Sequence, residues 1–503
     1  MAPGLANWVA LVLTVVLGLS CLVALSEDET LDKLRFVRHA QDAPLVSQYN
    51  YIVIGGGTAG CPLAATLSEH SRVLLLERGG LPSRNMSDQQ HFTDALADTS
   101  PASPAQRFVS EDGVVNARAR VLGGGSCLNA GFYTRASTDY VRAAGWDARL
   151  VNSSYRWVER ALVFRPAVPP WQAALRDALL EAGVTPDNGF TFDHVTGTKI
   201  GGTIFDSSGQ RHTPPPTSSA TRAPGGSPCF LYATVSRILF RQQEACRTPV
   251  AYGVVFTDPL GVQHRVYLRD GAKNEVILSA GTLGSPQLLM LSGVGPQAHL
   301  EAHGVQVLVD QPMVGQGVAD NPMNSVFIPS PVPVTLSLVQ VVGITRSGSF
   351  IEGVSGSEFG IPVSEGARRL ARSFGLFSPQ TGQLGTLPPK QRTPEALERA
   401  AEAMRRLDRR AFRGGFILEK ILGPVSSGHV ELRSADPRAN PAVTFNYFQE
   451  SEDLQRCVRG IQTIERVIQS RAFANFTYAN ASTESIFTDS ANFPRQPPAA
   501  ARQ

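Results

Sequence analysis

A glycine-rich turn between two apolar runs constrains the fold of this chain more than any other feature. Residues 51–80 read YIVIGGGTAGCPLAATLSEHSRVLLLERGG. The pattern predicts a strand at residues 52–54, a helix that begins near Thr58, and a second strand at residues 73–76. A strand, a tight turn and a helix in this order are typical of an α/β fold with a parallel sheet.

Three glycines in the turn, Gly55, Gly57 and Gly60, have the spacing G-x-G-x-x-G. They allow a tight turn, close approach of the backbone to a pyrophosphate, and close packing of helix on strand. The helix then directs unpaired N–H groups and its positive dipole end at the phosphates. Glu77 follows Gly55 by 22 residues, where an acidic residue can accept a hydrogen bond from a ribose hydroxyl. A glycine-rich surface turn would not account for Glu77, so the pattern predicts a dinucleotide site.

The composition is that of a globular protein with two or three domains. The chain has 503 residues, of which 42% are hydrophobic and 18% are charged. Its formal net charge of +3 is small, and no basic patch with interleaved aromatic residues indicates nucleic acid as a partner. The six cysteines are too scattered for a disulfide scaffold, and no C-x-x-C or His/Cys cluster indicates a metal site.

The N-terminus favours entry into the secretory pathway, to the endoplasmic reticulum or the extracellular space. Residues 8–25 form an uncharged apolar run, which fits either a cleavable signal peptide or a membrane anchor that would associate the protein with a membrane. Small residues near its end favour the signal peptide, although residues 1–7 lack the usual Lys or Arg. Four N-x-[ST] sequons are compatible with a glycoprotein: Asn85, Asn152, Asn475 and Asn480.

The rest of the chain alternates helical and strand-like segments around two irregular stretches. We predict helices at residues 171–183, 280–295, 395–413 and 453–470. We predict strands at residues 231–239, 251–256, 275–278, 416–432 and 442–448. Residues 81–112 are expected to be irregular, and the prolines within residues 201–230 exclude a regular helix there.

Three separated motifs resemble those of the glucose–methanol–choline (GMC) oxidoreductase family. They are YIVIGGGTAG with LLLERGG, then ARVLGGGSCLNAGFYTRA, then GTLGSPQLLMLSGVG at residues 281–295. Two further segments are similar to those of the plant HOTHEAD-like branch of the family: VGQGVADNP at residues 314–322 and GPVSSGHVELRSADPRANPAVTFNYF at residues 423–448. That branch also resembles the flavin-containing mandelonitrile lyases. The resemblance extends from about residue 51 to about residue 494.

This resemblance implies an α/β fold, in which a Rossmann-type FAD-binding domain is interleaved with a substrate domain built on an antiparallel sheet. We expect a leader at residues 1–25 and a discontinuous FAD-binding domain at residues 48–330. Residues 331–494 are expected to be mainly substrate domain, and residues 495–503 to be a tail unlike the family.

The resemblance also implies which residues hold FAD. Gly55, Gly57, Thr58, Ala59 and Gly60 would hold the pyrophosphate, and Glu77 and Arg78 would hold the adenosine ribose region. Val121 and the turn that ends at Gly125 would pass close to the cofactor, and Val235 would lie against the adenine. The flavin ring would be lined by Asn129, Ala130, Gly131 and Phe132. For Val121 and Val235, ordinary strand core is an equally good interpretation, and for residues 281–295 structural packing is as good an interpretation as ligand contact.

The residues that would complete alcohol oxidation in this family do not occur in the sequence. Relatives use a histidine base in a C-terminal W-H-Y-H-G-G-like segment, followed by an N-P-Q-A-like segment, and neither is present. The last histidine is His429, in a strand-like context, and we interpret it and His194 and His212 as structural. The sequence therefore predicts no catalytic residue, and the family fold is expected to be truncated at its C-terminus.

Three functions remain open from the sequence. The resemblance implies an FAD-dependent oxidoreductase of CH–OH groups, with long-chain ω-hydroxy fatty acids as substrates in the lipid polymers of cuticle or pollen wall. A hydroxynitrile lyase that binds FAD is the second. A catalytically inactive variant is the third. The expected partner is a small-molecule alcohol or hydroxy-lipid.

Overall fold

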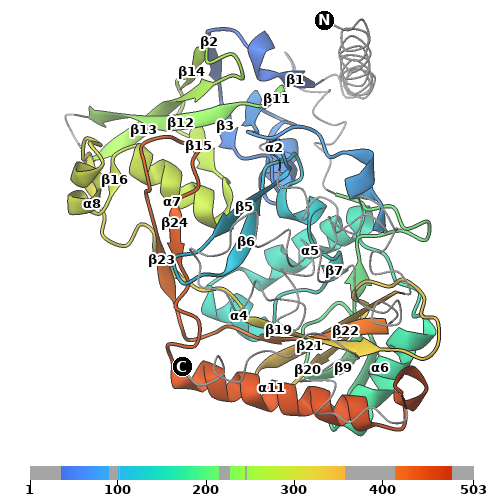
Figure 1. The fold of residues 1–503 in the computed structure, drawn as a ribbon. Helices are drawn as coiled ribbons and strands as arrows, with labels where there is room; N and C mark the ends of the chain where they lie inside the picture. Colours follow the sequence, from blue (N-terminus) through green and yellow to red (C-terminus); the bar gives the residue numbers. More distant parts are fainter. Residues whose placement is uncertain are drawn as a thin grey trace, which may run out of the picture.

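The structure, a computed structural model, describes residues 36–89, 100, 102–213, 227–243, 246–356 and 414–478. Figure 1 shows strands β3 (Tyr51–Ile54), β11 (Cys229–Leu231) and β15 (Glu275–Leu278) in the upper part of the molecule. A second sheet lies in the lower part, with helix α11 (Ser451–Gln469) along its outer side. The leader at residues 8–25, the predicted helix at 395–413, the tail at 495–503 and Asn480 lie outside the described residues. None of the described helices is both long and apolar enough to cross a membrane.

The upper sheet is parallel and is built around the predicted glycine-rich unit. Its strand order is β1–β11–β4–β3–β15. These strands are β1 (Val37–His39), β11 (Cys229–Leu231), β4 (Val73–Leu76), β3 (Tyr51–Ile54) and β15 (Glu275–Leu278). Ile52 and Leu74 are fully buried, as expected of apolar strands that are covered on both faces. The predicted strands at residues 52–54, 73–76 and 275–278 are confirmed.

Helix α2 (Gly60–Leu67) follows β3 after a turn, and it begins at Gly60 rather than near Thr58. The order β3, α2, β4 with parallel pairing of β3 on β4 is the βαβ unit that the spacing predicted. A four-stranded sheet, in the order β12–β13–β14–β2, lies next to the parallel sheet. Its strands are β12 (Thr234–Gln243), β13 (Cys246–Thr257), β14 (Gln263–Leu268) and β2 (Val46–Tyr49).

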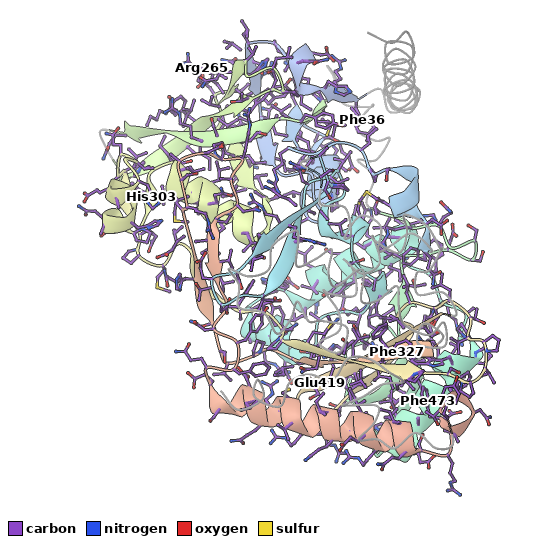
Figure 2. All side chains as sticks on the ribbon, in the orientation of Figure 1. Phe36, Arg265, His303, Phe327, Glu419 and Phe473 are labelled. Carbon is purple, nitrogen blue, oxygen red and sulfur yellow. The ribbon has the colours of Figure 1, made fainter. Side chains whose placement is uncertain are left out.

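The lower sheet has the order β19–β22–β21–β20–β9–β8 and is antiparallel except for the pair β8–β9. Its strands are β19 (Met323–Pro329), β22 (Gly414–Ile421), β21 (Ser349–Gly356), β20 (Val341–Ile344), β9 (Gly197–Ile200) and β8 (Asp187–Phe190). Helix α6 (Pro170–Glu181) and α11 cover one face, with Trp171 buried in the core between them. Figure 2 shows Phe473 beside the end of α11, and its ring packs edge-on against Trp171 at 5.2 Å.

The sheet draws strands from both sides of the boundary that we expected at residue 330. Strands β8, β9 and β19 precede it, and β20, β21 and β22 follow it. This arrangement agrees with a first domain that is interrupted by segments of the second. The boundaries themselves stay a prediction.

Two sequence expectations need correction. Residues 81–112 are not wholly irregular, because β5 (Ala105–Val109) pairs with β6 (Val115–Ala119) in a hairpin. The predicted strand at residues 416–432 is two strands, β22 and β23 (Gly428–Glu431), which belong to different sheets. A three-stranded sheet joins β23 to β18 (Gln316–Val318) and β24 (Ala442–Thr444). Helices α6, α7 (Gly281–Leu291) and α11 confirm three of the predicted helices.

Candidate functional site

A cavity of about 700 Å³ lies at the carboxyl ends of β3 and β4, beside the turn that leads into α2. Ligands of open parallel α/β sheets bind at this edge, and cofactor pockets usually measure about 300–1,000 Å³. Nine of the residues predicted from the sequence border this cavity: Gly55, Gly57, Thr58, Ala59, Glu77, Arg78, Val121, Gly125 and Val235. The fold therefore brings together most of the predicted cofactor site from segments that are far apart in the sequence.

The glycines of the first turn have different structural roles. Gly55 has a φ of 100°, and a Cβ atom at Gly60 would overlap the carbonyl oxygen of Gly55. These two positions need glycine for the turn and for packing. A Cβ atom at Gly57 would come no closer than 3.8 Å to another heavy atom, the Cα of Gly124. Gly57 borders the cavity, so its missing side chain leaves room for a ligand rather than for the protein.

Backbone donors in this turn are left free. Within the part of the chain that the structure describes, the amide N–H groups of Gly57, Thr58 and Ala59 have no hydrogen-bond partner. They precede or open the first turn of α2, where helix N–H groups have no internal acceptor and the helix dipole is positive. This donor set fits a phosphate or pyrophosphate group.

Glu77 ends β4 and is 5% exposed. Its Oε2 accepts a hydrogen bond from the Gly56 backbone N–H at 2.8 Å, and its Oε1 accepts one from Gly79 N–H at 2.8 Å. Burial raises the pKa of this carboxyl group, and the backbone donors partly oppose that shift. Each carboxylate oxygen keeps a second lone pair, so Glu77 can accept a ribose hydroxyl as predicted.

The second glycine-rich turn packs directly against the first. Gly123 donates its N–H to the carbonyl oxygen of Gly56 at 2.7 Å, and a Cβ atom at Gly124 would lie 2.6 Å from the Cα of Gly57. A Cβ atom at Gly125 would meet nothing within 4 Å, and Gly125 borders the cavity. The triple glycine thus serves both close backbone packing and an open cavity wall.

The segment that we predicted to line the flavin ring does not border this cavity. Asn129 Oδ1 accepts hydrogen bonds from Gly131 N–H at 3.0 Å and from Arg211 Nη1 at 3.1 Å. Phe132 packs edge-on against Phe350 of β21 at 5.9 Å, in a cluster that includes Ala130. These residues connect the glycine-rich turn to the lower sheet, and their contact with the flavin stays a prediction. Gly60 also lies outside the cavity wall, because it is buried beneath the turn.

Sequence reasoning missed one wall of the cavity. It is formed by the β5–β6 hairpin and by residues that follow β18, β23 and β24, and includes Asn116, Arg118, Asp320 and Phe445. The start of α7 also borders the cavity, from Ala280 to Ser285. The sequence signal for Arg118 was weak, because an arginine shortly before a glycine-rich turn resembles any exposed charge. The contact of α7 with the cavity favours ligand contact over pure packing for this motif.

None of the histidines in the described residues borders the cavity. His429 pairs with Gln316 and Thr444 in the three-stranded sheet β18–β23–β24, and its Nε2 lies 3.8 Å from Glu431. His212 Nε2 lies 2.9 Å from Asp206. His194 stacks on Phe350, and burial lowers its pKa. These contacts agree with the structural roles expected for the three residues.

The parallel sheet, the free amides and Glu77 define a dinucleotide-binding α/β protein. The chain belongs to the GMC oxidoreductase family: the N-terminal family model matches residues 49–323 and the C-terminal one matches residues 424–499. The second match therefore reaches into the tail at residues 495–503 that we expected to be unlike the family. The cofactor of the chain is FAD.

The chain is similar to several plant proteins along most of its length. It is 49% identical to Protein HOTHEAD of Arabidopsis thaliana, over 86% of this chain and 71% of that protein. It is 46% identical to an (R)-mandelonitrile lyase-like protein of the same plant, over 88% of this chain and 75% of that protein. It is 38% identical to sinalpyl alcohol oxidase Nec3 of Nesocodon mauritianus, over 95% of this chain and 80% of that protein.

Solved structures show the same fold at low sequence identity. Pyridoxine 4-oxidase from Mesorbium loti has a TM-score of 0.64 and 21% identity, over 87% of this chain and 84% of that one. A formate oxidase has a TM-score of 0.64 and 18% identity, over 89% of this chain and 86% of that one. The predicted fold class, a Rossmann-type domain with an antiparallel-sheet domain, is confirmed.

Proposed function

We propose that this chain oxidises the CH–OH group of long-chain ω-hydroxy fatty acids with FAD, in the formation of cuticle or pollen-wall lipid polymers. Its membership of an oxidoreductase family and the cavity at the glycine-rich turn support the FAD-dependent part of the proposal. Two similar proteins are named as alcohol oxidases, which supports alcohols as the substrate class. The fatty-acid substrate rests on the resemblance to the HOTHEAD-like branch.

The residues of this chain would bind and orient the cofactor. Bound FAD supplies a hydride acceptor for the alcohol carbon. The amides of Gly57, Thr58 and Ala59 offer donors to its phosphates, and Glu77 offers an acceptor to its ribose. The hydroxyl proton of the substrate needs a base, and no histidine among the described cavity residues is placed to be one.

A lyase is the second candidate function, because several similar proteins are named as (R)-mandelonitrile lyases, with 37–40% identity. A lyase would bind FAD without reducing it. The two functions therefore make opposite predictions for the colour of the flavin during turnover. A catalytically inactive variant, the third candidate, would give neither product.

One experiment separates the three candidates. The purified chain is incubated without oxygen with a long-chain ω-hydroxy fatty acid, and separately with mandelonitrile. We expect the fatty acid to bleach the flavin absorbance and mandelonitrile to release no cyanide. Cyanide release without bleaching would favour the lyase, and no reaction with either compound would favour the inactive variant.

We also propose that the protein enters the secretory pathway. Asn152 in helix α5 (Ala148–Leu162) and Asn475 are exposed, so both sequons can accept a glycan. After expression in plant cells, treatment with an N-glycosidase should lower the apparent mass of the chain. No shift in mass, together with a cytosolic distribution on fractionation, would contradict this proposal.

A further inference from the structure

Arg118 is a partly buried cation in the cavity wall with no carboxylate partner in the described part of the chain. It lies in β6, and its Nη1 donates to Gln287 Oε1 at 2.9 Å. Its Nη2 donates to the Ala439 carbonyl oxygen at 3.2 Å. Its Nε is buried and has no hydrogen-bond partner among the described residues. Both acceptors are neutral, and a guanidinium group has five N–H donors to satisfy.

Arg135 shows how a guanidinium group is neutralised elsewhere in this protein. Arg135 donates to both carboxylate oxygens of Glu159, at 2.6 and 2.8 Å, and this pair raises the pKa of Arg135. Burial, followed by the nearby charges of Arg78 and Arg120, lowers the pKa of Arg118 to about 9. Burying a cation without a counter-ion costs free energy. An anion bound in the cavity would therefore stabilise the charged guanidinium group of Arg118.

The acidic residues of the cavity wall do not supply that anion. Glu77 accepts the backbone N–H groups of Gly56 and Gly79, as described above. Asp320 accepts hydrogen bonds from Tyr447 Oη at 2.5 Å and from Asn116 Nδ2 at 3.4 Å. Neither carboxylate forms an ion pair with Arg118 within the described ranges.

The guanidinium group is held in place from two sides. Gln287 of α7 is 5% exposed, and its Nε2 donates to the same Ala439 carbonyl at 2.9 Å. Arg118, Gln287 and Ala439 therefore form a closed set of hydrogen bonds between β6, α7 and the loop after β23. A planar donor group that is fixed before the ligand arrives suits phosphate binding, because little side-chain entropy is then lost.

We propose that Arg118 is a cofactor-binding residue that supplies positive charge to the phosphate groups of FAD, and that Gln287 is its positioning residue. The residues of the glycine-rich turn provide neutral donors to the same groups, and Arg118 provides charge from another part of the wall of the same cavity. The inference concerns cofactor binding and does not depend on which alcohol is oxidised.

Adenosine, AMP and ADP test this proposal, because they share the nucleoside and differ in phosphate. Each ligand is titrated into the full chain after its FAD has been removed. In Arg118→Met, we expect the affinities for ADP and FAD to fall about 10- to 100-fold, as for a lost charged hydrogen bond. The affinity for adenosine should stay within about 3-fold. Arg118→Lys keeps the positive charge but lacks the planar set of guanidinium donors, so its affinity for ADP should fall by an intermediate amount.

Gln287→Glu tests the positioning role with little change in shape. A carboxylate at this place would pair with Arg118 Nη1 and compete with the ligand phosphates. We expect weaker binding of ADP and unchanged binding of adenosine. Arg176→Met is the matched control, because Arg176 pairs with Asp177 on α6 and does not border the cavity. It should change neither affinity.

Two results would overturn the proposal. One is an Arg118→Met protein that binds ADP as tightly as the unmodified chain. The other is an equal loss of ADP and adenosine affinity, which would indicate that Arg118 only supports the fold. If Arg118→Met fails to fold, Arg118→Lys and Gln287→Glu decide the question by the same comparison of ADP with adenosine.

Discussion

The Glu77 carboxylate lies 2.8 Å from the backbone nitrogen of Gly56 and accepts its hydrogen bond. This bond connects the end of β4 to the glycine-rich turn after β3, so the acidic residue helps to build the turn that borders the cavity. A carboxylate is suited to this place because it accepts from two backbone donors, one on each oxygen.

Glu77→Gln should therefore weaken both the fold and the cofactor site. A glutamine amide has only one oxygen, so one of the two buried N–H groups would lose its acceptor at a cost of about 1–3 kcal/mol. We expect a lower melting temperature and an affinity for FAD that falls about 10-fold. Glu69→Gln, on an exposed residue of the same βαβ unit, should change neither quantity. Equal behaviour of the two variants would contradict this role of Glu77.

The glycines of the turn predict opposite effects for two small substitutions. Gly60→Ala places a Cβ atom into the Gly55 carbonyl and should lower the free energy of unfolding by about 1–3 kcal/mol. Gly57→Ala has room in the protein and should change stability by less than about 1 kcal/mol, yet it should reduce FAD binding strongly. Urea unfolding and FAD titration measure the two effects separately. A Gly57→Ala protein that keeps full FAD affinity would argue against phosphate contact at this turn.

Glu419 predicts a pH dependence of stability. It is fully buried in β22 beside α11, as Figure 2 shows, and Asn324 Nδ2 donates to its Oε2 at 3.0 Å. Burial raises the pKa of this carboxyl group above its value in the unfolded chain. The stability that the protonated acid provides is full below the unfolded pKa, about 4.3, and is lost as pH rises through the native pKa.

Glu419→Gln should remove this loss because the amide is neutral at every pH. We expect the variant to be more stable than the unmodified chain by on the order of 1 kcal/mol at about pH 8. Urea unfolding at a series of pH values measures the difference. Identical slopes of unfolding free energy against pH for the two proteins would refute the assignment.

Trp171 should be the largest single contributor to the core below the lower sheet. Its indole ring lies against Gly353 and Gly415 of two neighbouring strands, where an added Cβ atom would come within 2.7 and 2.5 Å of ring carbons. Trp171→Ala should cost about 3–5 kcal/mol. Trp157→Ala, at a side chain that is 50% exposed, is the matched control and should cost about 1 kcal/mol or less. Thermal unfolding compares them, and similar costs would contradict this packing.

The sequence predicted those parts of the molecule that follow from local rules. The βαβ unit was predicted because the glycine spacing and the buried apolar strands are both local patterns. Helices α6 and α11 were predicted because each has an apolar stripe that packs on the lower sheet. Nine residues of the predicted cofactor site indeed border one cavity.

The remaining parts depend on contacts between distant segments. The loop of the β5–β6 hairpin contains Asp112-Gly113, with Gly113 at a φ of 86°, but the flanking strands were predicted to be irregular because their pairing depends on residues on both sides of that loop. Arg118 became a site residue only because Gln287 and Ala439, 169 and 321 residues away, hold it at the cavity. The break between β22 and β23 follows from their placement in two different sheets, which no periodicity of residues 416–432 reveals.

The most direct test of this account is the visible absorption spectrum of the full chain after incubation with FAD and removal of free ligand. We predict flavin absorption bands that stay with the protein, are displaced by ADP, and are absent from Gly57→Ala. A colourless protein that folds, or equal retention of FAD by the unmodified chain and Gly57→Ala, would contradict the claim that this cavity holds the cofactor.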